Sequence, residues 1–174
     1  MILHIVYIFL KLTFMGTIMS YSDIIRNVSN ALKNDLELNN LIQRTFRLDK
    51  RSLESIMGKT TTTAYRRIHT QLAITIDRVI EKLRKREKDK GLGESEKSEI
   101  LLDLSRSLIL VEYQRARKQI SKDVANMLID VINGLVDSVR QREIDVDDLR
   151  KIFERGRALI DTFAVIAYEY DKKR

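Results

Sequence analysis

The sequence predicts an all-α fold, a single-domain bundle of five or six helices joined by short loops. The 174 residues include no proline and only six glycines, which leaves too few turn signals for a many-stranded sandwich or barrel. Hydrophobic residues make up 44% of the chain, enough to build a core. In four consecutive segments they recur every three or four positions, the spacing of amphipathic helices.

The first nineteen residues form an apolar extension, residues 1–19, ahead of a bundle domain at residues 20–174. Their apolar run is interrupted by Lys11 and is too short for a membrane-spanning helix. They also lack the basic start and the small-residue cleavage site of a signal peptide. We hypothesise that Met15 or Met19 is the natural start and that the extension is dispensable. Two alternatives stay open: an N-terminal helix or strand that packs on the domain, and a membrane anchor.

Shorter helices are expected between residues 22 and 57, followed by four long helices at residues 61–90, 96–119, 122–142 and 146–172. Each long helix carries its apolar residues on one narrow stripe. The stripe of the first long helix comprises Tyr65, Ile68, Leu72, Ile76, Val79 and Leu83.

Polar residues at the expected helix starts can accept hydrogen bonds from free backbone N–H groups. On the apolar face of the last helix, Gly156 lacks a side chain and lets a neighbouring helix approach closely. The candidate caps are Thr60 to Thr63, Ser95, Ser121 and Asp145.

No set of residues assembles an active site, so we expect a protein that is not an enzyme and uses no metal or cofactor. Cysteine is absent and only two histidines occur, His4 and His69, which disfavours metal sites and histidine-based triads. His69 has no carboxylate four residues away on its helix, so a packing role is favoured. The acidic residues Asp145, Asp147 and Asp148 are explained by helix capping and by the helix dipole.

The excess of positive over negative charge is confined to the central third of the chain. Between residues 59 and 122 there are 16 Lys and Arg against 9 Asp and Glu, a net charge of +7. The rest of the chain holds 16 residues of each sign and is neutral. A localised positive field indicates an anionic partner, either a nucleic acid or an acidic membrane surface.

The basic residues of this segment lie on two consecutive helices, which an antiparallel hairpin would merge into one positive surface. We predict that this surface binds phosphates, with Tyr113 as a stacking group nearby. The alternative is a solvated helix face that Asp77 and Glu81 partly neutralise. The candidate phosphate-binding residues are Arg66, Arg67, Arg78, Lys82, Lys85, Arg106, Arg115, Arg117 and Lys118.

An acidic stripe lies on the following helix, where Asp123, Asp130 and Asp137 recur every seven residues opposite the apolar stripe. A negative stripe and a positive hairpin on one molecule can guide copies to dock head to tail, which generates open helical assemblies. The alternative is a solvated outer face.

Residues 61–174 resemble the small, all-helical subunit of type III-A CRISPR–Csm interference complexes. The segment Thr-Thr-Ala-Tyr-Arg-Arg-Ile at residues 62–68 is similar to the Thr-Ser-Gln-Leu-Arg-Lys start of a long helix in that family. Residues 104–117 are similar to its central Leu-Lys-Pro-Lys-Leu-Ala-Tyr segment, although they lack the proline. Near the C-terminus, Ala-Val-Ile-Ala-Tyr at residues 164–168 matches its closing Ala-Ile-Val-Ala-Tyr.

The resemblance implies a non-catalytic, cytoplasmic small subunit of a type III RNA-guided complex for antiviral defence. Several copies would stack as a filament, with their basic faces along the guide RNA and target RNA. The other subunits of the effector complex would be its partners, and no small-molecule substrate is expected.

Two other classes of protein remain open. One is a stand-alone helical nucleic-acid-binding or coiled-coil adaptor, although the long hairpin does not present a separate recognition helix. The other is a membrane-associated helical protein anchored by residues 1–19.

Overall fold

The computed structural model describes residues 21–86, 91–141 and 144–172, which form seven α-helices and no strand. The all-α prediction is confirmed, but five or six helices were too few. The short helices number three: α2 (Tyr21–Lys33), α3 (Asp35–Phe46) and α4 (Lys50–Met57). Two polar caps divide this segment, because the carboxamide of Asn34 accepts a hydrogen bond from the Leu36 N–H at 2.8 Å and the Asp49 carboxylate accepts one from the Ser52 N–H at 2.7 Å.

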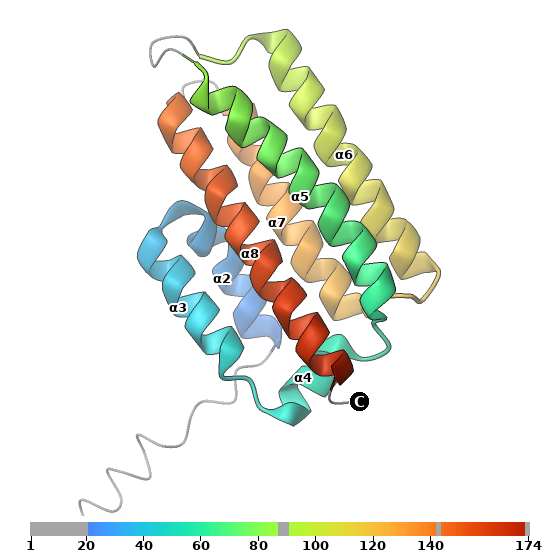
Figure 1. The fold of residues 1–174 in the computed structure, drawn as a ribbon. Helices are drawn as coiled ribbons and strands as arrows, with labels where there is room; N and C mark the ends of the chain where they lie inside the picture. Colours follow the sequence, from blue (N-terminus) through green and yellow to red (C-terminus); the bar gives the residue numbers. More distant parts are fainter. Residues whose placement is uncertain (1–20, 87–90, 142–143, 173–174) are drawn as a thin grey trace, which may run out of the picture.

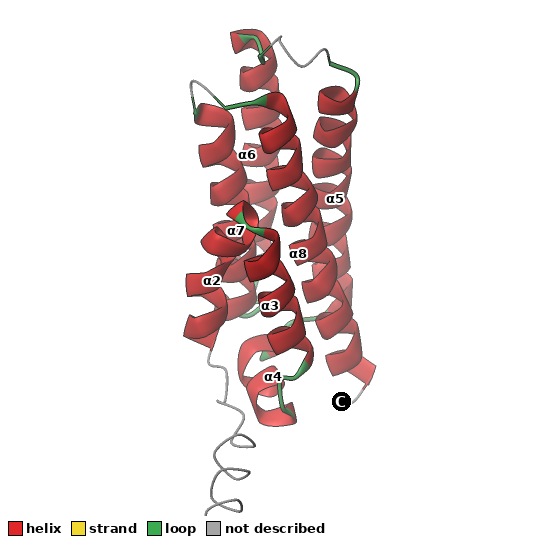
Figure 2. Ribbon diagram, turned by 90° about the vertical axis from the view of Figure 1, so that its left-hand side faces the viewer, coloured by secondary structure: helices red, strands yellow, loops and turns green. Residues whose placement is uncertain are grey.

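The four long helices are α5 (Thr62–Arg84), α6 (Glu94–Ala116), α7 (Lys122–Arg140) and α8 (Val146–Lys172). They form an up-and-down bundle in which α5 packs on α6 and α8, and α7 packs on the same two helices (Figure 1). The shorter α2 and α3 cover the side made by α7 and α8, and α4 lies at the end of the bundle where α8 finishes (Figure 2). The first long helix was predicted to extend to residue 90, but it ends at Arg84.

Three of the predicted caps are confirmed. The Thr61 hydroxyl accepts from the Ala64 N–H, the Ser121 hydroxyl accepts from the Val124 N–H, and the Asp145 carboxylate accepts from the N–H groups two and three residues on. The prediction for Ser95 was wrong. Helix α6 begins two residues earlier, after Gly93, and the Glu96 carboxylate accepts from the Gly93 N–H at 2.9 Å.

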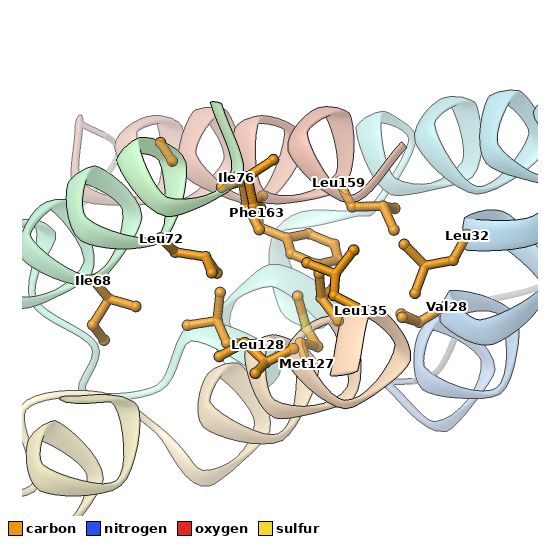
Figure 3. Close-up of a cluster of buried hydrophobic side chains, with 14 of the residues drawn as sticks. Val28, Leu32, Ile68, Leu72, Ile76, Met127, Leu128, Leu135, Leu159 and Phe163 are labelled. Atoms are coloured by element: carbon orange, nitrogen blue, oxygen red, sulfur yellow. The ribbon is translucent and has the colours of Figure 1, made fainter. Parts of the chain in front are cut away.

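The predicted apolar stripe of α5 is buried along its whole length. It faces α7 and α8 across a core in which side chains of α2 also take part (Figure 3). Gly156 does bring two helices close together, because a Cβ atom at this position would lie 3.0 Å from the Leu135 side chain of α7.

Helix α6 forms an edge of the four-helix bundle and is apolar on two sides. Its inner side buries Ile100, Leu104 and Val111, as predicted. Its outer side exposes large apolar side chains at seven- and four-residue intervals: Leu102, Ile109 and Tyr113. Each of these three side chains is more than half exposed.

The hypotheses about residues 1–19 concern a segment that lies outside the described residues. In the part of the chain that is described, no helix combines the length and the apolar character needed to cross a membrane.

Candidate nucleic-acid interface

Helices α5 and α6 form the antiparallel hairpin that the charge pattern suggested. Near one end of the hairpin, Lys82 of α5 lies 2.7 Å from Glu99 of α6. At the other end, the Thr61 N–H donates to the backbone carbonyl of Gln119 at 3.0 Å. The structure therefore brings all nine predicted cations onto one hairpin, but it divides them into two groups.

Five of the predicted cations are paired with carboxylates. Arg78 and Arg106 both bind Asp103, at 3.0 and 2.9 Å, and the other three pairs are Lys82 with Glu99, Lys85 with Glu81 and Arg115 with Glu112, at 2.6 to 2.7 Å. The hydrogen bond from Lys85 lowers the pKa of Glu81, so this carboxylate stays charged. Exposed pairs of this kind add little stability, but they cancel much of the local positive field.

The other four cations lie where the start of α5 meets the end of α6, and we call them the basic end cluster. Arg66, Arg67 and Lys118 are exposed and have no acidic partner among the described residues. The Arg117 guanidinium donates to the Tyr113 hydroxyl at 3.1 Å and lies 5.5 Å from the centre of that ring. No carboxylate of the described chain neutralises this end of the hairpin.

A polar groove of about 200 Å³ lies within the basic end cluster, between the two helices. Arg67 lines it from α5 and Arg117 from the end of α6, and the first turn of α5 contributes the positive end of a helix dipole. Gln114 also lines the groove. The residue is only 5% exposed.

This combination of groups suits a phosphate. Two guanidinium groups supply charge and paired N–H donors, and a helix start supplies backbone N–H groups that anions bind readily. Sequence reasoning found both arginines but missed Gln114. The available signal was its place in the buried row of α6 after Ile100, Leu104 and Val111, where a polar side chain is unexpected.

Lys118 sits in a strained backbone conformation. Its φ is +57°, and it is the one described residue other than glycine with a positive φ. The N–H groups of Lys118 and Gln119 donate to the carbonyls of Arg115 and Gln114, which closes α6 in the pattern that normally places glycine at this position. A lysine that occupies a glycine position indicates a use for its charge.

Replacing Lys118 by glycine is expected to raise the free energy of unfolding by roughly 0.5–1 kcal/mol, because glycine adopts a positive φ without steric cost. The same change should weaken binding to single-stranded RNA, because one cation is lost from the basic end cluster. Urea unfolding and RNA titration measure the two effects. As a control, Lys118→Ala should weaken RNA binding without the gain in stability. A Lys118→Gly variant that binds RNA as wild type does would contradict a role for this charge.

His69 packs between helices, as the sequence analysis favoured, and it has a carboxylate partner that the sequence did not reveal. Its Nε2 lies 2.7 Å from an Asp161 oxygen of α8, a residue 92 positions away. Arg157 pairs with the same Asp161 and with Asp77 of α5. These contacts join α5 to α8 along the side of α5 that faces away from α6.

The acidic stripe on α7 is not uniformly exposed. Asp137 is exposed, whereas Asp123 and Asp130 are partly buried, and burial raises the pKa of both carboxyls. Asp130 has no hydrogen bond or ion pair with any described residue. Its charge therefore destabilises the folded chain at neutral pH.

Asp130→Asn is expected to raise the free energy of unfolding at pH 7, by less than about 1 kcal/mol. The raised pKa means that the folded state binds the proton more tightly than the unfolded state. The ionised Asp130 carboxylate therefore lowers the free energy of unfolding at pH values above its pKa in the folded state. This loss vanishes as the pH falls below the pKa of an aspartate in the unfolded chain, which is near 4. Urea unfolding from pH 7 to pH 3 should show the gain shrinking with acid. The exposed Asp137→Asn serves as the control, and an equal gain there would contradict the role of burial.

Within the described residues, no three His, Cys, Asp or Glu side chains converge in a way that could hold a metal ion. No protein-family model, curated protein or solved structure matches the chain.

Proposed function

We propose that this protein is a non-catalytic small subunit of a type III CRISPR RNA-guided interference complex and binds the backbone of guide and target RNA through the α5–α6 hairpin. The observation that carries the proposal is the basic end cluster with its polar groove. The sequence resemblance supplies the identity of the partners, and it includes the first two turns of α5 and the last turns of α6, where this cluster lies.

The arrangement of charge favours RNA backbone over the other anionic partners. A groove with two arginines, a helix start and a buried amide is built to hold a single phosphate. A membrane surface is bound instead by a broad basic face with apolar side chains around it. The five paired cations extend along the hairpin from this groove, and a polyanion can compete with their carboxylates because exposed ion pairs are weak.

Stacking of several copies is the second part of the proposal. The exposed apolar row of α6, at Leu102, Ile109 and Tyr113, offers surface for a contact between subunits. Asp137, which is exposed on α7, offers a negative charge for the positive hairpin of the next copy.

Ile109→Glu is expected to lower the self-association of the full chain, because a charge would be buried in the contact. Sedimentation velocity over a range of concentrations, with and without RNA, measures the effect. Leu36→Glu places the same charge at an exposed leucine on α3 and serves as the control. A wild-type protein that sediments as a monomer under all these conditions would contradict stacking.

Affinity purification of the tagged protein from its native cells tests the function. We expect larger protein subunits and short RNAs of uniform length to co-purify. Single-stranded RNA of mixed length without other proteins would favour the stand-alone nucleic-acid-binding alternative. Recovery in the membrane fraction, lost when residues 1–19 are deleted, would favour the membrane-associated alternative.

A further inference from the structure

A second groove, of about 280 Å³, runs along the other side of the same end of α5, between α5 and α8. Thr62, Arg66 and His69 line it from α5, and Ala164, Val165 and Tyr168 line it from α8. Pockets for drug-sized ligands span about 300–1,000 Å³. A groove of this size therefore suits one planar ring system.

The walls of this α5–α8 groove are apolar and aromatic. The small side chain of Ala164 leaves room between the helices, while Val165 and Tyr168 are 46% and 57% exposed. Inside the groove, the rings of Tyr65 and His69 stack with their centres 6.4 Å apart and their planes 22° apart. An exposed tyrosine beside small apolar residues provides a face on which a flat ring can stack.

Two polar groups are available around these walls. The Nε2 of His69 is occupied by Asp161, which leaves Nδ1 for another partner. The Arg66 guanidinium lies at the groove without a carboxylate partner among the described residues.

We propose that the α5–α8 groove binds an unpaired nucleobase. The base stacks on Tyr168, its polar edge reaches His69 Nδ1, and its phosphate pairs with Arg66. Every base edge carries hydrogen-bond donors and acceptors side by side, so the site accepts different bases. The assignment of an RNA strand as the source of the base rests on the proposed function, whereas the pocket itself would bind a free nucleotide by the same contacts.

The polar groups decide between a base and an apolar peptide side chain as the occupant. An apolar side chain would leave the Arg66 charge and His69 Nδ1 without a partner. The position next to the basic end cluster also matters, because Arg66 and Arg67 are consecutive on α5 and line the two different grooves. A strand held by its phosphate at Arg67 would therefore pass close to this pocket.

The test uses the full chain and the fluorescence of 2-aminopurine, which stacking quenches. The probes are 2-aminopurine ribonucleoside monophosphate, a short single-stranded RNA with one central 2-aminopurine, and the same RNA annealed to its complement. We expect quenching of the free nucleotide and of the single strand, and little quenching of the duplex. Tyr168→Ala should lower the affinity for the free nucleotide about tenfold. Phe46→Ala, at an aromatic residue 55% exposed on α3, should leave it unchanged.

Thr62→Val keeps the shape of the side chain and removes the hydroxyl. It should raise the midpoint of thermal unfolding, because an unsatisfied buried group is removed. Thr70→Val, at an exposed position of α5, should not raise it.

Wild-type affinity in Tyr168→Ala, or no quenching of either single-stranded probe, would overturn the base pocket.

The free nucleotide separates this pocket from the proposed function. If the free nucleotide binds and Tyr168→Ala weakens it, but RNA does not bind at the basic end cluster, the pocket stands and the RNA-binding function fails. If RNA binds in a salt-dependent manner but its 2-aminopurine is quenched equally in wild type and in Tyr168→Ala, the function stands and the pocket is refuted.

Discussion

Leu135→Ala is expected to lower the free energy of unfolding by about 4 kcal/mol. Leu135 of α7 is completely buried and lies in a cluster with Val28 and Leu32 of α2 and Phe163 of α8 (Figure 3). The end of the Leu135 side chain also fills the space beside Gly156 of α8. The cavity left by the substitution therefore cannot close unless the backbone of α8 moves. A cavity that cannot collapse gives the upper part of the range for such substitutions.

Urea unfolding of Leu135→Ala against Leu102→Ala measures this effect. Leu102 is 53% exposed on the outer side of α6, so its truncation should change the free energy of unfolding by less than about 0.5 kcal/mol. A similar loss in the two variants would show that the outer row of α6 is covered in solution. A negligible loss in Leu135→Ala would show that α2 does not pack on α7 as the structure has it.

The double variant Arg67→Gln with Arg117→Gln is expected to lower the affinity for single-stranded RNA at least tenfold. Each phosphate contact of a single strand contributes about 0.7 to the slope of log affinity against log salt, so the loss of two contacts should flatten it by about 1.4. Both side chains are exposed, so the free energy of unfolding should change by less than about 0.5 kcal/mol. RNA titrations at several salt concentrations measure affinity and slope together.

The matched control is the double variant Arg78→Gln with Arg106→Gln, which also removes two positive charges from this hairpin. Both of these side chains bind Asp103, so their positive field is already reduced, and we expect a smaller loss of affinity and slope. Equal losses in the two double variants would show that the whole hairpin contacts RNA uniformly, as the sequence alone suggested. If neither double variant loses affinity for RNA, the basic face of the hairpin is only a solvated surface.

The helices and their inner faces were predictable because they depend on short-range periodicity. The apolar stripe of α5 predicted from spacing is the stripe that is buried, and Thr61, Ser121 and Asp145 cap helices because their side chains reach backbone groups within three residues. The predicted total of five or six helices was too low because caps at Asn34 and Asp49 restart the helix within a segment of weak periodicity. The identity of nine exposed cations on the α5–α6 hairpin was likewise available from the sequence.

Only the tertiary structure decided which of those cations are neutralised and what lies between them. The pairing of Arg78 with Asp103 depends on the register of two packed helices, and the pairing of His69 with Asp161 joins residues 92 positions apart. The basic end cluster, the groove beside Gln114 and the α5–α8 groove beside Tyr168 arise in the same way, where one helix start meets the ends of two others. Helical periodicity places a side chain on a face of its own helix. The rotation and register of neighbouring helices, set by packing of the core, determine which side chains of other helices face it.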